Sequence, residues 1–360
     1  MAHLFEPLTL RGLTMRNRIG VSPMCEYSSV EGFANEWHVV HLGSRAVGGA
    51  GLVMTEAAAV SPEGRITPAD LGIYDDRHVD KLREIVHFIH QHGGVAGIQL
   101  AHAGFKASTA APWHGGGPIT LAQGGWRPVV APSAQPFTQG WIVPHALSVE
   151  EIAAVREQFA AAARRALSAG FRLIEVHAAH GYLLHEFLSP LTNKRTDAYG
   201  GSFENRTRFL RETVETLRRT IPQDMPLLVR ISASDWSQGG WAIEDSVELA
   251  KALKTLGVDL IDCSSGGISP HAKIAIAPGY QVPFAGSIRS GAGVATAAVG
   301  LITDARQADD IIARGDADMV FLARELLRQP YWPLLAASQL GQDGAAWPKQ
   351  YERAKPRPNA

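Results

Sequence analysis

The sequence lacks the marks of several protein classes. Only two of its 360 residues are cysteines, Cys25 and Cys263, so it cannot form a disulfide framework and we expect a reduced, cytoplasmic location. No apolar run approaches the ~18 residues of a transmembrane helix, and the first residues do not resemble a signal peptide. The net charge is −1 and no lysine- or arginine-rich run occurs, so we expect neither nucleic acid nor a membrane surface as a partner.

Strand-like and helix-like segments alternate along the whole chain. Hydrophobic residues make up 46% and charged residues 19% of the sequence, which predicts a packed globular core. Apolar runs typical of parallel strands buried on both faces occur at 18–24, 50–60, 95–104, 171–180, 226–235, 260–267, 294–302 and 318–326. Amphipathic patterns predict helices at 36–47, 80–90, 148–170, 203–219, 244–257, 282–291 and 305–316. The spacing of Ser148 and Glu151 is that of a capping box, and Gly170 ends the same helix.

Eight strand–helix pairs predict the α/β class and a closed (β/α)₈ TIM barrel with long βα loops. The alternative is an open doubly wound sheet, which is disfavoured because no G-x-G-x-x-G motif follows the first strand. The longest loops, 105–144 and 181–202, are expected to be functional because such lengths are unusual in a compact domain. We expect a single domain over residues 1–345. The polar, proline-rich residues 346–360 would form a tail that is either disordered or an arm that docks elsewhere.

The active site of a TIM barrel lies where its strands end, and barrels often bind phosphate after the seventh and eighth strands. Gly300, Ala323 and Arg324 occupy those positions and suit phosphate. The alternative is that Gly300 is only a turn glycine and Arg324 only a surface arginine. Arg230 stands in an apolar strand and needs a negative partner. That partner is either a carboxylate such as Glu56 or Glu175, or an anionic ligand. With the amide of Gln99, these groups suit a planar heterocycle that carries a phosphate.

His177, His180 and Tyr182 follow the fourth strand, and three interpretations are open. The histidines could bind a metal ion, but no third or fourth ligand stands beside them, so we expect none. They could also be ordinary core histidines. In the third interpretation, two imidazole N–H groups hold one substrate oxygen as negative charge grows on it. Tyr182, with an ordinary pKa of ~10, would then donate a proton to carbon.

Four sequence blocks resemble the Old Yellow Enzymes, a family of FMN-dependent ene-reductases. They are PMCEY from Pro23, QLAHAG from Gln99, HAAHGYLLHEFLSPLTNKRTDAYGGSFENRTRF from His177 and GLITDARQADDIIARGDADMVFLAR from Gly300. The block N-K-R-T-D-x-Y-G-G-S-x-E-N-R is highly specific, and the resemblance covers nearly the whole chain. The cysteine in the first block and the closing QYER resemble the thermophilic-like subgroup, which includes the xenobiotic reductases.

The resemblance implies a barrel that binds FMN at its mouth and accepts a hydride from NADPH or NADH. The flavin N5 would then pass a hydride to an activated alkene, such as an enone, a maleimide or a nitro compound, and Tyr182 would protonate it. The residues implied to contact FMN are Pro23, Met24, Cys25, Ala57, Gln99, Arg230, Ser265, Gly266, Gly300, Ala323 and Arg324. The residues implied to contact the substrate are Cys25, Tyr27, His177, His180 and Arg353.

Three positions qualify the resemblance. In the subgroup, the arginine that matches Arg353 crosses into a neighbouring subunit's substrate pocket, which implies a homodimer or a homotetramer. Glu26 stands where the subgroup often has glutamine. Phe105 stands where it often has arginine, and we expect a less basic entrance loop that favours apolar enones and weakens the expectation of NADPH over NADH.

Two other functions are considered beside the reductase. The first is a metal-dependent TIM-barrel hydrolase that uses His177 and His180, which a colourless protein with bound zinc would indicate. The second is a flavin-binding protein without turnover, such as a sensor or a store. Its flavin would not be bleached by NADPH or NADH.

Overall fold

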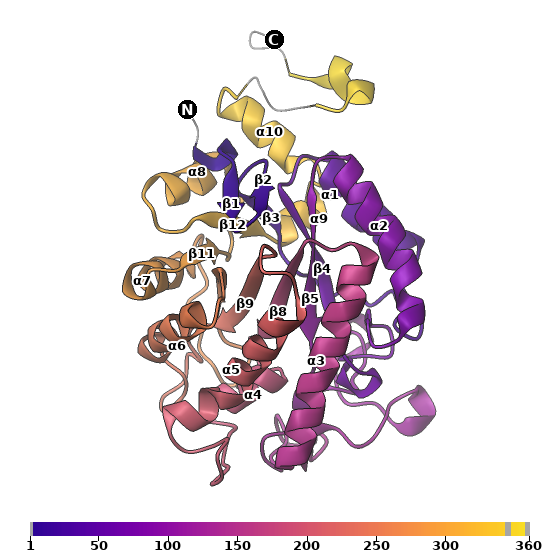
Figure 1. Cartoon of the computed structure of the whole chain (residues 1–360), viewed down its shortest axis with the longest axis vertical. Helices are drawn as coiled ribbons and strands as arrows, with labels where there is room; N and C mark the ends of the chain where they lie inside the picture. Colours follow the sequence, from indigo (N-terminus) through magenta and orange to yellow (C-terminus); the bar gives the residue numbers. More distant parts are fainter. Residues whose placement is uncertain (1–2, 343–346, 357–360) are drawn as a thin grey trace.

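The computed structural model describes residues 3–342 and 347–356, and its centre is a closed barrel of eight parallel strands (Figure 1). Neighbours in the barrel are neighbours in the chain, and the last strand pairs with the first. The strands are β3 (Ile19–Val21), β4 (Leu52–Ala59), β5 (Val95–Ala101), β8 (Leu173–Ala178), β9 (Leu227–Ser232), β10 (Leu260–Ser264), β11 (Ala295–Ala298) and β12 (Met319–Leu322). The predicted (β/α)₈ barrel is confirmed, and the open sheet is wrong.

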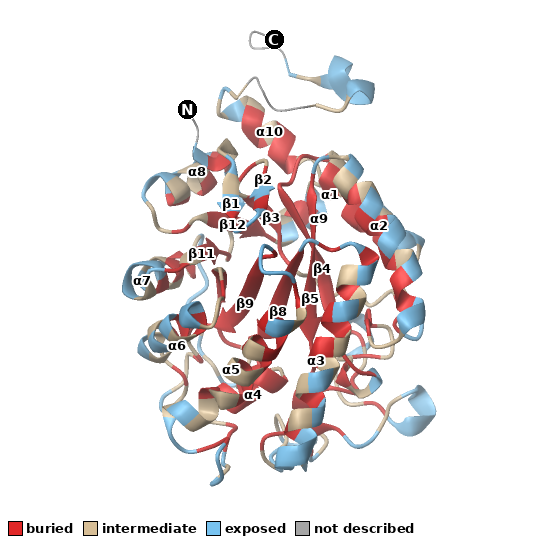
Figure 2. Cartoon of the chain, viewed as in Figure 1, coloured by how far each residue is buried: buried red, intermediate tan, exposed pale blue. Residues whose placement is uncertain are grey.

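Most helices surround the barrel and bury one face against it, as the red inner and blue outer sides of the ribbons show, whereas α4 is buried throughout (Figure 2). They are α1 (Glu36–Val47), α2 (Val79–Gln91), α3 (Val149–Ala169), α4 (Leu183–Leu188), α5 (Phe203–Thr220), α6 (Ile243–Thr255), α7 (Val282–Ala292), α8 (Ala305–Ala313), α9 (Arg324–Arg328) and α10 (Trp332–Gln339). The capping box of α3 is present at Ser148, and Gly170 ends that helix with a φ of 92°. Among the described residues, no helix has the length and apolarity needed to cross a bilayer.

The barrel interior changes character along each strand. On β9, Leu228 lies in an apolar cluster at the strand's start, and Arg230, two residues on, begins the polar part. The outward residues that alternate with them, Val229 and Ile231, pack in the large core under the helices. Side chains of a strand alternate between its two faces. A strand that looks uniformly apolar can therefore carry a charge into the barrel.

The apolar end of the interior is closed by a hairpin of β1 (Leu8–Leu10) and β2 (Leu13–Met15). Two strand glycines make room for large side chains there. A Cβ at Gly20 would lie 2.2 Å from the Phe321 ring, and one at Gly97 would lie 2.3 Å from the Met54 sulfur. These glycines let a small-diameter barrel be filled completely, as the close packing of protein interiors requires.

The predicted long loops follow β5 and β8. The first contains the short helices η4 (Gly104–Lys106), η5 (Pro112–His114) and η6 (Leu121–Gln123) and a small sheet of β6 (Val130–Ala131) and β7 (His145–Ala146). The second contains α4. Three further short helices are η1 (His3–Phe5), η2 (Pro62–Gly64) and η3 (Asp76–His78). The segment η7 (Lys349–Ala354) lies beyond α10, apart from the barrel (Figure 1). The expected domain boundary at 345/346 lies outside the described residues.

Candidate active site at the barrel mouth

The first strand delivers a half-buried segment to the mouth. Pro23, Met24 and Cys25 follow β3 and are part exposed. Tyr27 follows with a φ of 47°, a left-handed conformation that is uncommon for a tyrosine. Burial around the sulfur, with the Asp70 and Glu56 charges nearby, raises the pKa of the Cys25 thiol well above its ordinary value. Cys25 is therefore a neutral thiol at pH 7 rather than a reactive thiolate.

Four buried polar side chains line the interior beneath the mouth: Gln99, Glu175, Arg230 and Asp262. Gln99 Nε2 donates to Glu175 Oε1 at 2.7 Å. The ion pair of Arg230 runs from Nε to Asp262 Oδ2 at 2.9 Å. The alternative in which Arg230 pairs with a carboxylate is therefore confirmed, but the partner is Asp262 rather than Glu56 or Glu175. The sequence could not identify Asp262, because the register that pairs Asp262 with Arg230 across β10 and β9 becomes known only in the fold.

This polar layer has unmet hydrogen-bonding capacity. Burial raises the pKa of Glu175 to about 8 and that of Asp262 to about 6, with Asp262 adding to the rise at Glu175 and Arg230 opposing both. The ion pair is not aligned as a hydrogen bond, and Arg230 donates no hydrogen bond to any described residue. A buried guanidinium without such bonds is costly unless a ligand accepts them. The layer can therefore bind an acceptor-rich ligand from above.

The two histidines and the tyrosine lie together at the end of β8. The ring centroids are 5.2 Å apart for His177 and His180, and 5.0 Å apart for His177 and Tyr182. Burial, with Arg230 as the next cause, lowers the pKa of both histidines well below the ordinary value. Both rings are neutral at pH 7. Burial also raises the pKa of Tyr182 well above its ordinary value, so its hydroxyl stays protonated.

Hydrogen bonds determine which ring nitrogens can donate. His177 Nδ1 accepts from the Ala179 backbone N–H at 3.3 Å, which places the proton of the neutral ring on Nε2. His180 Nε2 is 2.7 Å from Ser264 Oγ, so Nδ1 is the nitrogen left for a ligand. His180 donates from Nδ1 only when the Ser264 hydroxyl donates to Nε2. The pair can hold one oxygen with two N–H groups if Ser264 takes that orientation.

The metal interpretation finds no support in the geometry. Across residues 3–342 and 347–356, no group of three or more histidine, cysteine, aspartate or glutamate side chains is placed to hold a metal ion. A cation, Lys106, also lies beside the histidine pair. Lys106 Nζ donates to the His180 carbonyl at 2.8 Å and also to the Gly267 carbonyl.

Lys106 was missed by the sequence argument. Its ammonium group lies 5.6 Å from the Tyr182 ring centroid, and burial lowers its pKa to about 8. The signal was present, because this lysine closely follows the QLAHAG block on the loop after β5. It ties the loops after β5, β8 and β10 together at the mouth.

The predicted phosphate residues share a cavity of about 220 Å³. Gly300, Ala323 and Arg324 line it, and a Cβ at Gly300 would lie 2.9 Å from Gln281 Nε2. Ser265 and Gly266 lie beside it at the end of β10, where Ser265 Oγ donates to Gln281 Oε1 at 2.5 Å. Sequence reasoning missed Tyr280, Gln281, Ser264, Thr303 and Arg328, which also line this cavity or close it.

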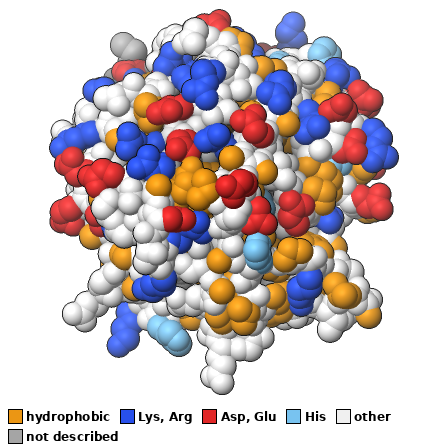
Figure 3. Space-filling model, turned by 60° about the horizontal axis from the view of Figure 1, so that its bottom comes forward, with side chains coloured by type: hydrophobic (Ala, Val, Ile, Leu, Met, Phe, Trp, Pro, Cys, Tyr) orange, Lys and Arg blue, Asp and Glu red, His pale blue; other side chains and the backbone are white. Residues whose placement is uncertain are grey.

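On the face in Figure 3, blue and red side chains are interspersed and no patch of one sign dominates. This agrees with a net charge of −1. An anionic ligand must therefore be selected by local groups such as Arg230 and Arg324 rather than by a long-range field.

The two residues that depart from the subgroup, Phe105 and Glu26, both make contacts with other side chains of the protein. Phe105 is only 2% exposed and packs against Phe137 at 5.4 Å between ring centroids. A less basic entrance loop and a preference for apolar enones stay predictions, because the burial of the Phe105 ring tests neither. Glu26 turns toward α1, where Oε2 accepts from Trp37 Nε1 at 3.0 Å.

Arg353 is exposed and lies in η7. That segment and α4, which follows Tyr182, are at opposite ends of the molecule (Figure 1). Arg353 therefore does not enter the site of its own chain. Tyr351 packs edge-on against Tyr331 at 5.8 Å between ring centroids, which anchors the segment near α10.

Comparison with known proteins gives a consistent picture. The model of the NADH:flavin oxidoreductase / NADH oxidase family matches residues 3–343. An NADPH dehydrogenase of Geobacillus sp. (strain WCH70) is 50% identical over 97% of this chain and 98% of the relative. An NADPH dehydrogenase of Halalkalibacterium halodurans is 49% identical over 98% of each chain.

Two solved structures are similar at lower identity. Morphinone reductase in complex with tetrahydroNAD has a TM-score of 0.76 and 27% identity, covering 94% of this chain and 91% of that one. A 2-naphthoyl-CoA reductase complex with 2-naphthoyl-CoA has a TM-score of 0.83 and 25% identity over 94% of this chain. The chain spans about half, 52%, of that second protein.

Proposed function

The chain belongs to the NADH:flavin oxidoreductase / NADH oxidase family, and from that premise we propose that it is an FMN-dependent NADPH dehydrogenase of the Old Yellow Enzyme type that reduces activated carbon–carbon double bonds. The relatives named NADPH dehydrogenase support the choice of NADPH as the donor. Enones, maleimides and nitroalkenes are the proposed substrate class. The thermophilic-like subgroup remains a prediction.

The residues at the mouth fit FMN. Arg230 is buried and donates no hydrogen bond to any described residue. The ring of an acceptor-rich heterocycle would accept hydrogen bonds from this guanidinium group. Its positive charge would favour negative charge on the reduced ring. The cavity at Gly300 and Arg324 would hold the phosphate. The proposed FMN contacts are Pro23, Met24, Cys25, Ala57, Gln99, Arg230, Ser265, Gly266, Gly300, Ala323 and Arg324.

FMN supplies, when bound, the group that accepts a hydride from NADPH and gives it to the substrate. The residues of the chain do the rest. His177 donates from Nε2 to the carbonyl or nitro oxygen of the substrate, and His180 donates from Nδ1 with Ser264 on its other nitrogen. These donors act in a buried site, where they stabilise growing negative charge better than water does.

Tyr182 delivers the proton that completes the reduction. Its hydroxyl stays protonated at every ordinary pH, because burial raises its pKa. Only a strongly basic carbon can take a proton from such a phenol, which restricts the transfer to a substrate that has already accepted a hydride. Cys25 and Tyr27, on the segment after β3, would shape the other side of the substrate pocket.

The observation that carries the proposal is the joint placement of His177, His180 and Tyr182 above the polar layer that holds Arg230. A colourless zinc hydrolase would need further ligands, which the described residues do not supply. The test begins with the cofactor released by heat from purified protein. FMN is expected on chromatography, and FAD or no flavin after reconstitution would contradict the proposal.

A phenol titration tests the two histidines. Phenolates offer an oxygen anion to the same donors, so His177→Ala should weaken phenol binding and slow enone reduction by ~10²–10³, the usual loss for one oxyanion donor. His185→Ala is unsuitable as a control because that ring forms a buried pair with Asp235. His87→Ala is suitable, because His87 is exposed on α2, on the outside of the barrel. Unchanged phenol affinity in His177→Ala would show that His177 does not bind the oxygen of the ligand.

We extend the proposal to assembly and location. A homodimer or homotetramer would let Arg353 of one chain enter the pocket of another, since it cannot reach its own. Both cysteines are free, which suits a reducing cytoplasm. Residues 1–345 would act as one catalytic domain and residues 346–360 as the intersubunit arm.

A further inference from the structure

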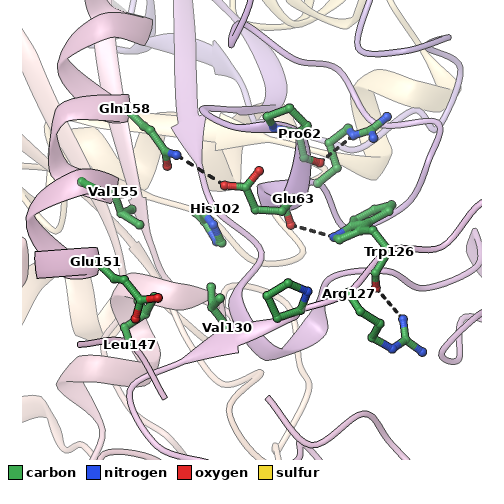
Figure 4. A pocket seen from close by; sticks show the side chains of 13 residues that line it. Pro62, Glu63, His102, Trp126, Arg127, Val130, Leu147, Glu151, Val155 and Gln158 are labelled. Atoms are coloured by element: carbon green, nitrogen blue, oxygen red, sulfur yellow. Dashed lines mark hydrogen bonds between the residues drawn. The ribbon is translucent and has the colours of Figure 1, made fainter. Parts of the chain in front are cut away.

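Two further buried histidines bond to the segment that carries Tyr182. The His102 carbonyl accepts from the Leu183 backbone N–H at 3.0 Å, while the His102 ring lines a cavity of about 500 Å³ beside α3 (Figure 4). His185 is fully buried on α4, and its Nδ1 accepts from the Gly181 backbone N–H at 2.9 Å. The His185 ring therefore contacts the turn that directly precedes Tyr182, and the mechanism proposed above gives this ring no role.

The turn between the two catalytic groups has an unusual backbone. His180 and Gly181 are both left-handed, with φ of 60° and 73°. This conformation is uncommon for a histidine, so the surrounding structure must hold it in place. A Cβ at Gly181 would lie 2.3 Å from the Gly267 carbonyl oxygen, so the turn packs closely against the loop after β10. The direction of the Tyr182 phenol relative to the His180 ring depends on this turn.

His185 holds the turn from the start of α4. Tyr182 is the N-cap of that helix and makes no side-chain cap, and His185 is the third helical residue. In a capping box the third residue accepts from the backbone N–H of the N-cap. Here it accepts from the N–H of Gly181, one residue earlier. Gly181 is buried, so without this acceptor its N–H would be costly to leave unpaired.

Asp235 determines which nitrogen of the His185 ring carries the proton. Because Nδ1 accepts from Gly181, the proton of the ring lies on Nε2, which is 2.9 Å from Asp235 Oδ1. Asp235 Oδ2 accepts from the Ser189 hydroxyl at 2.6 Å and from the Trp241 backbone N–H at 2.7 Å. Both side chains are fully buried, and each of their four polar atoms has a partner within the protein. The pair is therefore a fixed support for the turn rather than a site for a ligand.

We propose that His185 and Asp235 are a positioning pair for alkene reduction, which holds the turn before Tyr182 in its reactive geometry. The inference rests on the function proposed above. His185 acts through the Gly181 backbone and does not touch the substrate. Asp235 acts through His185, because it keeps the ring proton away from the nitrogen that accepts from the turn. The phenol of Tyr182 and the ring of His180 then stay aligned on one substrate.

Asp235→Asn tests the pair with almost no change in volume. The amide oxygen must take the place of Oδ2, because Ser189 and Trp241 both donate there. The amide NH₂ group then faces His185 Nε2 and forces the ring proton onto Nδ1, where it meets the Gly181 N–H. The variant therefore removes the acceptor of the turn while the ring itself stays in place.

The expected loss falls on one half-reaction of the FMN-loaded enzyme. Reoxidation by an enone, measured per bound flavin, should slow by up to ~10²-fold, the usual loss when a reacting group is displaced by about 1 Å. Reduction by NADPH should change much less, because only reoxidation uses the proton of Tyr182. Wild-type rates in Asp235→Asn, or equal slowing of the two half-reactions, would overturn the proposal. A wild-type enzyme that no enone reoxidises would instead contradict the proposed function.

Ser246→Ala is the matched control for the loss of a buried hydrogen bond. The Ser246 hydroxyl accepts from Trp241 Nε1 at 2.7 Å and donates to the Ala233 carbonyl at 3.0 Å, so it is close to the pair without bonding to it. This variant should be less stable to denaturant and should keep the wild-type rate of reoxidation. If it slows reoxidation as much as Asp235→Asn does, general loss of packing explains both and the positioning role is contradicted.

Two substitutions of His185 separate its hydrogen bond from its bulk. His185→Asn and His185→Leu both remove the ring and have similar volumes, but the asparagine places an oxygen near the position of Nδ1. His185→Asn should therefore retain faster reoxidation than His185→Leu, because the Gly181 N–H keeps an acceptor. Equal rates in the two variants would show that the acceptor has no effect on the turn.

Nuclear magnetic resonance tests the pair without any substrate. In the wild-type, FMN-loaded enzyme labelled with ¹⁵N-histidine, the His185 ring should show the Nε2–H tautomer, and in Asp235→Asn it should change to the Nδ1–H tautomer. A wild-type His185 ring with its proton on Nδ1 would overturn the proposal whatever the variants do, because such a ring cannot accept from Gly181.

Discussion

The two ends of the barrel interior are built from the same strands but from opposite chemistry. At the start of the strands the inward side chains are leucine, methionine and phenylalanine, and the β1–β2 hairpin closes that end. Two residues further on, the inward positions become Glu175, Arg230 and Asp262. Burial of the side chains at the apolar end stabilises the folded protein. The polar end costs free energy until a ligand meets its unpaired groups.

This division assigns stability to one end and chemistry to the other. The inward alternation of a strand makes the division sharp, since no residue belongs to both layers. Substitutions at the apolar end should therefore change stability and leave catalysis intact, and substitutions of the catalytic groups above the polar end should slow the reaction.

Tyr182→Phe should produce the largest effect, and it should fall on one half-reaction only. Reoxidation by an enone should slow ~10²–10⁴-fold, the usual contribution of a general acid. Reduction by NADPH should stay nearly unchanged, because it needs no proton on carbon. Stopped-flow absorbance of the flavin measures both rates. Equal slowing of the two half-reactions would indicate a structural role for the phenol.

Leu228→Ala should damage the apolar end alone. Leu228 is fully buried in the layer beneath Arg230, so its truncation should lower the free energy of unfolding by about 2–5 kcal/mol. Denaturant unfolding measures this loss. The rates of both half-reactions, expressed per bound flavin, should match the wild type. A large loss of rate per flavin would mean that the two layers are not independent.

The substitution Arg353→Ala tests whether a second chain contributes an arginine to the substrate pocket. An arginine that reaches the neighbouring substrate contributes a charge-assisted bond, so enone reduction should fall roughly tenfold or more. Mixing Arg353→Ala with Tyr182→Phe under subunit exchange should restore activity, because some mixed sites are then intact. A monomer at working concentration would exclude the arm, as would full activity after deletion of the residues beyond Pro348.

Deprotonation of Lys106 should give the smallest effect. As the pH rises, it should lower the rate of reoxidation and raise the stability of the folded protein. Burial lowers its pKa from the ordinary value of 10.5 to about 8. As the pH rises through about 8, the ammonium loses its proton and its bonds to the loops after β8 and β10 weaken. Reoxidation should slow roughly two- to fivefold between pH 7 and pH 9, the scale of one hydrogen bond.

Stability should change in the opposite direction. The folded state gives up the Lys106 proton before the unfolded state does, so this group raises stability as the pH rises from about 8 to 10.5. Lys106→Met should flatten both profiles. A pH dependence of reoxidation that survives in Lys106→Met would assign the titration to another group.

The sequence predicted the barrel architecture correctly, because strands, helices and helix caps depend on local sequence patterns. Eight apolar runs, the capping box at Ser148 and the positions of Gly300 and Arg324 are all readable along the chain. The residue set at the end of β8 was also readable. Their position after the fourth predicted strand singled out His177, His180 and Tyr182, and the resemblance agreed with the role proposed for them. The fold places their rings together.

What failed was pairing between strands and the direction of loop side chains. Asp262 could not be matched to Arg230 without the register of β9 and β10. The inward direction of the Phe105 ring, which is 2% exposed, could not be predicted from the local sequence of its short helix. The cavity at His102 depends on α3 lying against two loops far away in sequence. Such contacts leave no local pattern to read.

One measurement tests the central claim most directly: an anaerobic titration of the flavin band, first with NADPH and then with cyclohexenone. The account predicts that NADPH bleaches the band and that cyclohexenone restores it, with cyclohexanone as the product. A band that NADPH cannot bleach would support the alternative of a flavin-binding protein without turnover. A bleached band that neither cyclohexenone, maleimide nor a nitroalkene restores would contradict the assignment of His177, His180 and Tyr182 to alkene reduction.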